Sequence, residues 1–579
     1  MFRLVGKYTR QFMWAAILAP IFVIAEVVFD VFIPKLMSQI IDEGINGAGG
    51  SNLELIYQLG GKMVLYSIAA MITGTISGIC ASIASSGFIH NLRLAMYEKI
   101  QAFSFKNMDK FEVPSLVTRM TKDMREVRMA YLAIVRQLVR APLQLIVSIY
   151  MVFSINASLA GIFLVAIPIL GTGLYLISSN AHPRFRVLMK KFDAMNGSLE
   201  ENFVGIRVVK TFVREDYEKK KFALSSEGVV KQQRFAENLV LFNSPLFNLV
   251  LYGCMIAVSW FGGKQIIVGT MKTGEFMSYL TYLRSILFGL MILSMSLMQI
   301  IFAQASIDRA NEILNEEIDI TDDDRDENLL VEDGSIEFRN VSFKYSDTAQ
   351  NYALSNIDLR IESGEVVGII GATGSSKTTL VQLLPRLYDV TEGAVIVGGH
   401  DVKEYKLTNL RKEVAMVLQK NVLFSGTIEE NLKWGNPEAT LEEVVEAARC
   451  AQADDFINGF PEGYQTELGQ GGVNVSGGQK QRLCIARALL KKPKIIILDD
   501  STSAVDTDTD KRIREALSQR LSGMTTIIIA QRISSIMDAD KIIVMEDGMI
   551  KDCGVHEELL QRNEVYRDLY QTQLKGVGE

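Results

Sequence analysis

Six long apolar stretches in the first half of the chain constrain the fold more than any other feature of the sequence. Each is long enough for an α-helix to cross the hydrocarbon core of a bilayer, which takes about 20 residues. Because helices satisfy their own backbone hydrogen bonds inside a bilayer, these stretches predict six membrane-spanning helices. They run from Met13 to Ile33, Val64 to Ile89, Tyr131 to Phe153, Leu159 to Ser178, Val240 to Phe261 and Tyr279 to Phe302.

The charges in the loops orient these spans. Arg3, Lys7 and Arg10 precede the first span, and many lysine and arginine residues lie between the second and third spans. Because such loops stay on the cytoplasmic side, both segments are predicted to be cytosolic, which places the acidic connection 42–54 outside. The cytosolic connections continue the helical periodicity without a Pro/Gly cluster, so the helices are predicted to project well beyond the membrane.

The composition agrees with a membrane protein and excludes other classes. Of the 579 residues, 48% are hydrophobic, and the net charge of −7 comes from basic residues spread among acidic ones, so no nucleic-acid surface is indicated. The five cysteines show no CxxC or metal-like spacing, which argues against a disulfide framework or a zinc site. No cleavable signal peptide is expected, because the first apolar segment is far longer than a signal sequence.

Two acidic residues in the first span form a candidate substrate site. Glu26 and Asp30 lie four residues apart and therefore on one helix face. Ionisable groups at this depth face protein or a water-filled cavity. They are candidates for binding a cationic substrate, and the alternative is ion pairing with Arg136 and Arg140 near the inner end of the third span.

A methionine-rich face of the sixth span is a second candidate substrate surface. Met291, Met295 and Met298 share one helical face with Phe302. Flexible, polarizable methionine side chains suit varied apolar ligands. Ordinary helix packing is the alternative.

Two short cytosolic segments, Met108 to Phe111 and Lys210 to Glu215, each place an aromatic side chain among charges. They are candidate docking elements, and solvated turns are the alternative. From Ile307 the chain becomes polar, and an acidic run follows at 319–327. We therefore expect a transmembrane domain over 1–306, a linker over 307–335 and a second domain over 336–579.

The second domain contains the stretch Gly371-Ala-Thr-Gly-Ser-Ser-Lys-Thr-Thr379 between an apolar run and an amphipathic segment. A strand, a small-residue loop and a helix in this order gather backbone N–H groups around a polyphosphate. Lys377 would reach the β and γ phosphates, and the Thr378 hydroxyl would ligate Mg²⁺. Ser376 stands where the pattern expects glycine. The other residues of the loop predicted to contact the polyphosphate are Gly371, Thr373, Gly374, Ser375 and Thr379.

Other side chains of this domain suit the same nucleotide. Tyr345 is a candidate to stack on the purine, with packing as the alternative. Gln419 ends an apolar strand and is a candidate to sense Mg²⁺ or water, with a solvent-facing amide as the alternative. Asp499 ends a buried strand, where it would hold Mg²⁺, and Asp500 follows it. A later apolar strand ends at Gln531.

A second candidate anion site opens another helix. Ser476, Gly477, Gly478 and Gln479 precede a helical pattern, so their backbone N–H groups would point at an anion. One nucleotide does not need two such sites in one domain. The segment Ser503 to Asp506 is predicted to be a turn.

In this order and spacing, these segments resemble the Walker A, Q-loop, signature, Walker B, D-loop and switch motifs of an ATP-binding cassette (ABC) protein. The whole chain resembles a half-transporter of the ABC exporter type. The resemblance implies an α-helical transmembrane domain, with six spans and long cytosolic extensions, plus an α/β P-loop ATP-binding cassette domain. It implies a multi-pass protein of the cell membrane with a cytoplasmic N-terminus and cassette. The docking segments then resemble coupling helices, and Phe2 to Arg10 resembles an elbow helix along the inner leaflet.

The resemblance also implies an activity. In the family, each ATP, bound with Mg²⁺, lies between the Walker motifs of one cassette and the signature of the other. ATP-driven export of a lipophilic or amphiphilic compound by an ATP-hydrolysing translocase is therefore expected, with a second half-transporter and membrane lipids as partners. A lipid or peptide exporter is one alternative, and a regulatory or gating membrane protein that binds ATP without transporting is another.

Three departures from the family pattern fall in the site built on this chain's own Walker motifs. The family expects glutamate at Asp500, histidine at Gln531 and glycine at Ser376, whereas the signature departs only by valine for leucine at Val475. In this respect the chain resembles the degenerate-site subunit of bacterial heterodimeric multidrug exporters. Asp500, Gln531 and Gln419 are its candidate catalytic residues, and hydrolysis is expected mainly at the composite site that a partner completes.

Overall fold

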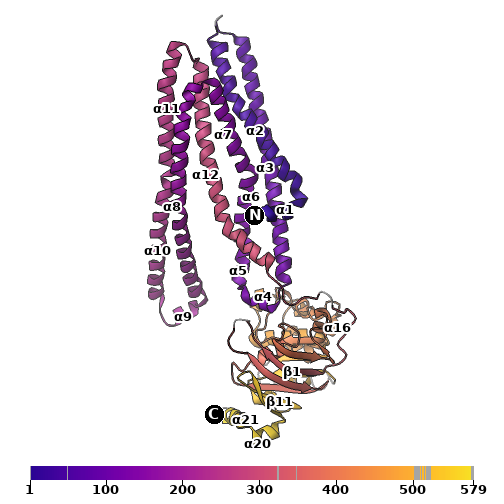
Figure 1. The fold of residues 1–579 in the computed structure, drawn as a ribbon. Coiled ribbons are helices and arrows are strands. Elements are labelled where there is room, and N and C mark those ends of the chain that lie inside the picture. The colour runs from indigo at the N-terminus through magenta and orange to yellow at the C-terminus, as the bar shows by residue number, and fades with distance from the viewer. Residues whose placement is uncertain are drawn as a thin grey trace. The chain divides into compact units, whose positions relative to one another are not determined.

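The structure divides the chain into two compact units (Figure 1). It is a computed structural model that describes residues 2–47, 50–322, 325–346, 349–500, 509, 511–513, 515–516 and 523–575. One unit comprises Met1–Gln101 and Val113–Glu316, and the other comprises Ala102–Glu112 and Glu317–Glu579. The first unit is helical, and the second combines helices with sheets.

The first unit consists of long helices joined by short turns. Its α-helices are α1 (Phe2–Tyr8), α2 (Met13–Gln39), α3 (Leu53–Gln101), α5 (Val113–Thr118), α6 (Met124–Leu132), α7 (Leu138–Ile155), α8 (Ala157–Val204), α9 (Ile206–Thr211), α10 (Glu215–Leu241), α11 (Asn243–Val268) and α12 (Thr273–Asn315). Short irregular turns of helix lie between some of them: η1 (Arg10–Phe12), η2 (Ile40–Ile45), η3 (Arg119–Asp123) and η4 (Ala133–Gln137).

Six helical segments of the described chain are long and apolar enough to cross a membrane, which confirms the six predicted spans. These segments are Arg10–Ile45, Leu53–Gln101, Val113–Ile155, Ala157–Val204, Glu215–Val268 and Thr273–Asn315. They extend well beyond the apolar stretches. Helix α3 contains 49 residues, which at 1.5 Å per residue is about 74 Å, more than twice the thickness of a hydrocarbon core.

Helix α12 also continues past the start of the predicted linker. Ile307, Ala310 and Ile313 repeat at helical spacing and are buried, so the apolar face of the helix extends to Asn315. The domain limits expected from the sequence stay a prediction.

The first and sixth spans are tied together near one end by polar groups. Asp42 accepts hydrogen bonds from the backbone N–H groups of Gly274 (2.6 Å) and Glu275 (3.0 Å) at the start of α12. The hydroxyl of Tyr282 donates to the carbonyl of Val31 at 2.6 Å. A carboxylate at a helix N-terminus satisfies N–H groups that have no partner within the helix. These bonds therefore set the register of α12 against α2.

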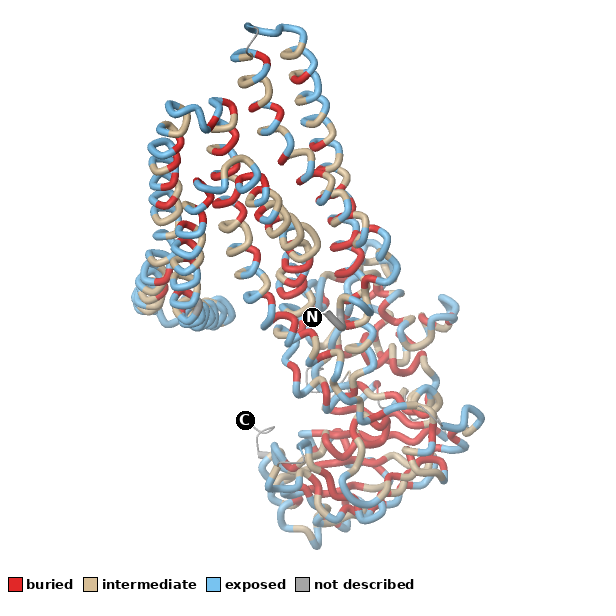
Figure 2. The backbone as a smooth tube through the Cα atoms, turned by 45° about the horizontal axis from the view of Figure 1, so that its top comes forward, coloured by how far each residue is buried: buried red, intermediate tan, exposed pale blue. Residues whose placement is uncertain are grey.

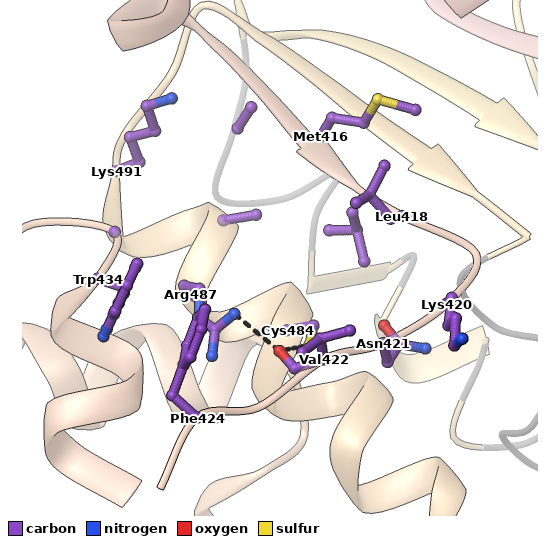
Figure 3. Close-up of a pocket in the computed structure, with 14 residues that line it drawn as sticks. Met416, Leu418, Lys420, Asn421, Val422, Phe424, Trp434, Cys484, Arg487 and Lys491 are labelled. Atoms are coloured by element: carbon purple, nitrogen blue, oxygen red, sulfur yellow. Dashed lines mark hydrogen bonds between the residues drawn. The ribbon is translucent and has the colours of Figure 1, made fainter. Parts of the chain in front are cut away.

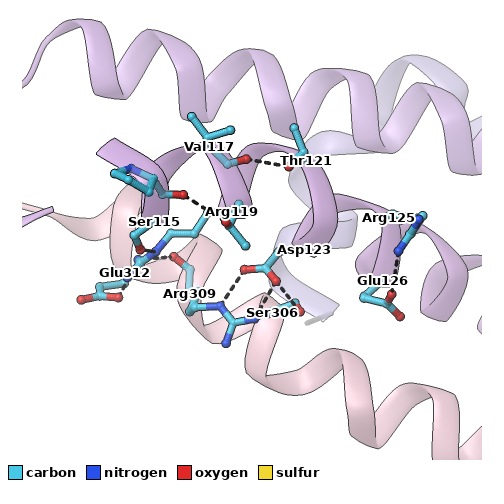
Figure 4. Close-up of polar contacts among 12 residues, drawn as sticks. Ser115, Val117, Arg119, Thr121, Asp123, Arg125, Glu126, Ser306, Arg309 and Glu312 are labelled. Carbon is cyan, nitrogen blue, oxygen red and sulfur yellow. Dashed lines mark hydrogen bonds and ion pairs between the residues drawn. The ribbon is translucent and has the colours of Figure 1, made fainter. Parts of the chain in front are cut away.

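A buried ion pair holds α12 against η3 (Figure 4). Asp123 is 2% exposed and accepts hydrogen bonds from Nε and Nη2 of Arg309, both at 2.6 Å. The Ser306 hydroxyl donates to the same carboxylate at 3.1 Å. Two parallel charge-assisted bonds are strong and directional, and a buried carboxylate is costly unless it is paired. The cluster therefore joins the end of the sixth span to the segment that leads into the third.

We expect Asp123→Asn to destabilise the helical unit by about 2 kcal/mol, because the charge and one acceptor oxygen facing Arg309 are lost. The midpoint of thermal unfolding of the full chain in lipid nanodiscs should fall by several degrees. Glu126→Gln is the control, since Glu126 pairs with Arg125 at 3.9 Å on the surface (Figure 4), where ion pairs contribute little. Equal midpoints for the two variants would contradict the assignment.

The second unit is built around a six-stranded sheet with the strand order β12-β11-β3-β10-β9-β6. Its strands are β3 (Val366–Gly371), β6 (Val414–Val417), β9 (Ile495–Asp499), β10 (Thr525–Ile529), β11 (Lys541–Glu546) and β12 (Met549–Gly554). All neighbouring strands are parallel except β12, which pairs antiparallel with β11. An antiparallel sheet of order β2-β1-β4-β5 contains β1 (Ile336–Phe343), β2 (Leu354–Ile361), β4 (Glu392–Val397) and β5 (His400–Asp401), and β7 (Gly426–Thr427) pairs with β8 (Glu467–Leu468).

Helices cover these sheets, and the core lies between the layers. The helices are α4 (Phe105–Lys110), α13 (Lys377–Gln382), α14 (Leu407–Glu413), α15 (Ile428–Lys433), α16 (Leu441–Cys450), α17 (Asp454–Asn458), α18 (Gly477–Leu490), α20 (His556–Arg562) and α21 (Glu564–Lys575), with the short turns η5 (Gly463–Gln465), η6 (Gln470–Gly472) and η7 (Ile533–Ser535). Every residue of β9 and β10 is buried, as expected for parallel strands covered on both faces. In Figure 2 the strands of this unit are mostly buried, whereas buried residues alternate with exposed ones along the long helices of the first unit.

The two predicted docking segments differ in their surroundings. Met108 to Phe111 ends α4, and Phe111 is 3% exposed and stacked on Phe103 with ring centroids 5.6 Å apart. Lys210 to Glu215 follows the start of α9, and Phe212 is 70% exposed. Of these two aromatic side chains, only that of Phe212 is presented to solvent.

Candidate nucleotide site

The carboxyl ends of neighbouring parallel strands meet at one edge of the six-stranded sheet. Because β3, β10, β9 and β6 are adjacent and run in the same direction, the segments that follow them come together. A pocket of about 360 Å³ lies at this edge. It is lined by Gly371, Thr373, Gly374, Ser376, Lys377, Thr378, Thr379, Gln419, Asp499, Asp500, Ile529 and Gln531. The structure thus gathers residues from the predicted Walker A, Q-loop, Walker B and switch segments in one place.

The loop between β3 and α13 needs small residues and one left-handed position. A Cβ on Gly371 would lie 2.1 Å from the carbonyl oxygen of Met545, so only glycine fits there. Ser376 has φ 67° and ψ 25°, the left-handed region in which a non-glycine residue costs about 1–2 kcal/mol. Serine in place of the glycine of the pattern therefore strains this position.

Lys377 lies folded over this loop. Its Nζ donates to the carbonyl oxygens of Gly371 and Ala372, both at 2.9 Å, and to the hydroxyl of Ser375 at 3.2 Å. Burial lowers the pKa of Lys377, and the nearby Walker B carboxylates oppose that shift. The ammonium group is thus held inside the pocket by acceptors that phosphate oxygens are able to replace.

Thr378 and Asp499 fit a magnesium ion. The Thr378 hydroxyl donates to Oδ1 of Asp499 at 3.1 Å, and Oδ2 of Asp499 is buried without a hydrogen-bond partner. Burial raises the pKa of Asp499, against the opposing effects of Thr378 and Lys377. Hydroxyl and carboxylate oxygens are ligands that Mg²⁺ prefers, and it completes its shell with phosphate oxygens and water. Bound there, Mg²⁺ would neutralise phosphate charge.

Two neutral amides hold the carboxylate of Asp500. Nε2 of Gln531 donates to its Oδ2 at 2.7 Å, and Nε2 of Gln419 approaches the same oxygen at 3.4 Å. Burial raises the pKa of Asp500, whereas these hydrogen bonds lower it. Gln481 donates to the backbone carbonyl of Asp500 at 3.2 Å. Sequence reasoning missed Gln481, whose only signal was its place on the helix that the signature opens.

The predicted signature residues do not line this pocket. Ser476 caps α18, since its hydroxyl accepts from the Gln479 N–H at 3.3 Å while the Gln479 side chain accepts from the Ser476 N–H at 2.8 Å. This reciprocal capping fixes the helix start. Ser476 and Gly477 are exposed, and Gly478 is half-buried. The predicted turn at Ser503 to Asp506 lies outside the described residues.

Tyr345 joins the pocket through Thr379. Its hydroxyl is hydrogen-bonded to Oγ1 of Thr379 at 2.8 Å, and the residue is 43% exposed. The ring contacts Phe343 and Tyr388 edge to face, with centroids 4.9 and 5.3 Å away. Sequence reasoning missed Tyr388, because an aromatic residue in a loop carries no local signal.

The acidic pair in the first span is bound to arginine. Nη1 of Arg140 lies 2.9 Å from Oε1 of Glu26, and its Nη2 lies 3.2 Å from Oδ2 of Asp30. Oε2 of Glu26 is buried without a hydrogen-bond partner. Arg136 lies instead against α3, with Nη1 3.5 Å from the position of a Cβ on Gly78. Of the two arginines considered from the sequence, Arg140 thus holds both carboxylates.

The methionine face of α12 is partly open. Met291 and Met298 are half-buried, and Met295 is exposed. Ser296 is buried and bonded to Gln137 at 2.8 Å. The methionine side chains are therefore accessible, whereas the neighbouring serine faces the helix contact.

Six candidate spans joined to an α/β domain with this pocket define an ATP-driven membrane transporter subunit. The model of the ABC transporter transmembrane region matches residues 16–291, and the ABC transporter model matches residues 354–503. The chain belongs to the ABC transporter family. It is a half-transporter, a multi-pass membrane protein with a cytosolic cassette that has ATPase activity, and ABC exporters of this kind function as dimers.

Relatives extend over most of the chain. The uncharacterized ABC transporter ATP-binding protein YfiB of Bacillus subtilis is 34% identical over 99% of this chain and 98% of its own length. The ATP-dependent lipid A-core flippase of Syntrophus aciditrophicus is 35% identical over 86% of this chain and 83% of its own length. YgaD of Bacillus subtilis, named as a putative multidrug export protein, is 30% identical over 93% of this chain and 94% of its own length. A solved bacterial Atm1-family ABC exporter with ATP bound shares the fold, with a TM-score of 0.81 and 24% identity over 97% of this chain and 98% of that chain.

We expect Ser376→Gly to stabilise the cassette by about 1 kcal/mol, because glycine removes the strain of the left-handed position. The midpoint of thermal unfolding of the full chain should rise. Ser376→Ala is the control, since alanine retains the Cβ and should give no gain in stability. A rise of the same size for alanine would attribute the effect to the lost hydroxyl.

Proposed function

We propose that this chain is one half of a heterodimeric ABC exporter of lipophilic or amphiphilic compounds. Its own Walker site is impaired, and ATP is hydrolysed mainly at the composite site formed with the partner. The observation that carries the proposal is the location of the unusual residues. Ser376, Asp500 and Gln531 all line one pocket, whereas the signature lies elsewhere and retains its serine, glycines and glutamine.

The chemistry of the pocket argues for slow hydrolysis there. Aspartate is one methylene shorter than glutamate, so the carboxylate of Asp500 lies about 1.5 Å farther from an attacking water. Misplacing a general base costs on the order of 10²–10⁴ in rate. The side-chain amides of Gln531 and Gln419 also donate hydrogen bonds to the carboxylate of Asp500, which orients it toward these two side chains. Gln531 also offers the γ phosphate a neutral donor.

The signature helix supports the complementary half of the proposal. Ser476 and Gly477 are exposed at the start of the capped, 14-residue helix α18. Backbone N–H groups at a helix start suit a phosphate. A homodimer would contain two impaired sites. A partner with glutamate and histidine at the positions of Asp500 and Gln531 would instead form one competent site with this signature.

The tip of α9 supports a contact with the partner. Val204, Val208, Phe212 and Val213 are 60–83% exposed around this short helix. Clustered exposed apolar side chains mark an interaction surface. We place the partner's cassette against this tip.

The cassette of this chain carries a matching apolar pocket of about 350 Å³ (Figure 3). Met416, Leu418, Phe424 and Trp434 line it, and the rings of Phe424 and Trp434 are stacked with centroids 4.2 Å apart. Arg487 supports the wall of this pocket by donating a hydrogen bond to the carbonyl of Val422 at 3.1 Å. We assign this pocket to α9 of the partner, so that each half-transporter contacts the other's cassette.

The proposed cargo follows from the membrane domain. The accessible methionine face of α12, formed by Met291, Met295 and Met298, suits varied apolar groups. Glu26 and Asp30 share a single guanidinium, so the three groups together favour a cation. A lipid exporter is the second candidate, because a lipid A-core flippase is among the relatives.

We expect Ser476→Arg to abolish ATP turnover by the pair, because a bulky cation would fill the only competent site. Asp500→Asn should reduce turnover only modestly, since it alters a site that is already slow. The measurement is ATPase activity of the complex copurified from its native membrane, with Lys480→Arg, beyond the signature on α18, as the control. Robust ATPase activity from this chain purified alone would contradict the proposal.

We expect Glu26→Gln to weaken transport of cationic compounds several-fold while neutral compounds are unaffected, because one carboxylate of the triad loses its charge. Uptake into inside-out vesicles measures both. Glu54→Gln, at the exposed start of α3, is the control. Equal loss for both kinds of cargo, or loss of folded protein, would assign Glu26 to the ion pair with Arg140 alone.

A further inference from the structure

A continuous line of contacts joins the nucleotide pocket to α4 within the second unit. Thr379 lines the pocket and is bonded to the hydroxyl of Tyr345 at 2.8 Å. The Tyr345 ring meets the Tyr388 ring edge to face, with centroids 5.3 Å apart and planes at 89°. The Tyr388 hydroxyl donates to Oδ2 of Asp109 on α4 at 2.7 Å. Each link is a direct contact, although Asp109 and Tyr388 lie 279 positions apart in the chain.

Tyr388 is firmly held at the centre of this line. It is buried, and its ring also contacts Phe343 at 5.5 Å and Phe105 of α4 at 5.9 Å. Burial raises the pKa of Tyr388, and the carboxylate of Asp109 raises it further. The hydroxyl therefore stays protonated and donates a hydrogen bond to that carboxylate.

Helix α4 is short and depends on such contacts. A reciprocal cap between Ser104 and Asn107 starts it, and Asn107 donates to the carbonyl of Glu317 at 2.8 Å. Its own backbone bonds include Met108 N–H to Ser104 O at 3.0 Å and Phe111 N–H to Asn107 O at 3.3 Å. A six-residue helix is marginal in isolation, so side-chain anchors decide how often it opens.

A nucleotide in the pocket strengthens the line at its first link. The Thr379 hydroxyl has one proton and two lone pairs, so it is able to donate to a phosphate oxygen while it accepts from Tyr345. Hydrogen bonds arranged in series polarise one another and become stronger. A purine on the exposed face of Tyr345 would also restrict the ring, whose edge-to-face contact with Tyr388 depends on orientation.

We propose that Tyr345, Tyr388 and Asp109 form a relay that reports nucleotide in this chain's own pocket to its own helix α4. Tyr388 and Asp109 act as positioning residues, since neither lines the pocket. The relay needs no γ phosphate and no second cassette. The slow Walker site of the proposed function would thereby have a regulatory role. Nucleotide bound in the pocket keeps α4 docked against the rest of the second unit even while no ATP is hydrolysed there.

The test is hydrogen–deuterium exchange of residues 105–111 in the full chain in lipid nanodiscs, with and without saturating MgADP. ADP is the probe because it lacks the γ phosphate that reaches the opposite signature, so the result is independent of the proposed heterodimer. In the wild type, MgADP should slow exchange of these amides roughly tenfold, the effect of about one hydrogen bond to a charged group.

Tyr388→Phe keeps the ring and removes the bond to Asp109, so the slowing by MgADP should disappear. The Kd for MgADP should rise by up to about tenfold, because α4 is docked most of the time in the wild type and the effect of docking on affinity equals the effect of MgADP on docking. Tyr352→Phe is the matched control: it removes a similar bond, from Tyr352 to Glu392 at 2.7 Å, elsewhere on the unit. This control should exchange like the wild type.

Asp109→Asn is the second variant, because Asp109 is exposed and its replacement leaves the fold intact. It should reduce the slowing, since the amide oxygen accepts a weaker hydrogen bond than the carboxylate. Undiminished slowing in both variants, or no slowing in the wild type, would overturn the relay. A rise in the MgADP Kd far beyond tenfold in both variants would also overturn it, by showing that these residues build the pocket itself.

Discussion

The parallel pairing of β3, β10, β9 and β6 is the constraint on which the nucleotide site depends. Ile529 is in register with Ile369 on one side and with Asp499 on the other, and Val417 pairs with Leu498. A slip of one residue in any strand would exchange the side chains that pack against the two covering layers, and a close-packed core does not accommodate that exchange. The packing on both faces therefore fixes where each strand ends. The phosphate loop, the Walker B carboxylates and the two glutamines meet because their strands end side by side.

The helical unit depends on a different constraint. Each long helix satisfies its own backbone, so the apolar stripes alone leave the register between helices weakly specified. Polar ties supply that register: Asp42 at the start of α12, Asp123 with Arg309, and Arg140 with the acidic pair of α2. A buried charge is costly without its partner, so other registers are disfavoured. The first two ties hold the sixth span to the first and the third, and Arg140 holds the third to the first.

The ATP pocket and the signature helix of this chain differ in how well they match the family pattern. The pocket for ATP contains a strained serine, a short carboxylate held by amides and a neutral switch residue, whereas the capped signature helix has no such defect. Helices α4 and α9 show a parallel contrast, because Phe111 is buried and Phe212 is exposed. Both contrasts support the proposed heterodimer, in which this chain supplies its signature and α9 to a partner. The relay through Tyr388 links nucleotide binding in the pocket to α4.

The sequence by itself determined the class of fold and the location of the site. Apolar length and strand–loop–helix order are local properties, so six spans and a phosphate loop at 371–379 were predictable. The order of the motifs along the chain identified the family for the same reason. Ser376 was also recognisable as a departure, because the expected glycine is part of a local pattern.

Only the tertiary structure decided which side chains meet. It paired Glu26 and Asp30 with Arg140, set Gln419 and Gln531 on the carboxylate of Asp500, and buried Tyr388 between the pocket and α4. These contacts join residues that are tens to hundreds of positions apart. Their partners depend on strand order, helix register and packing, and local propensity carries no information about any of these.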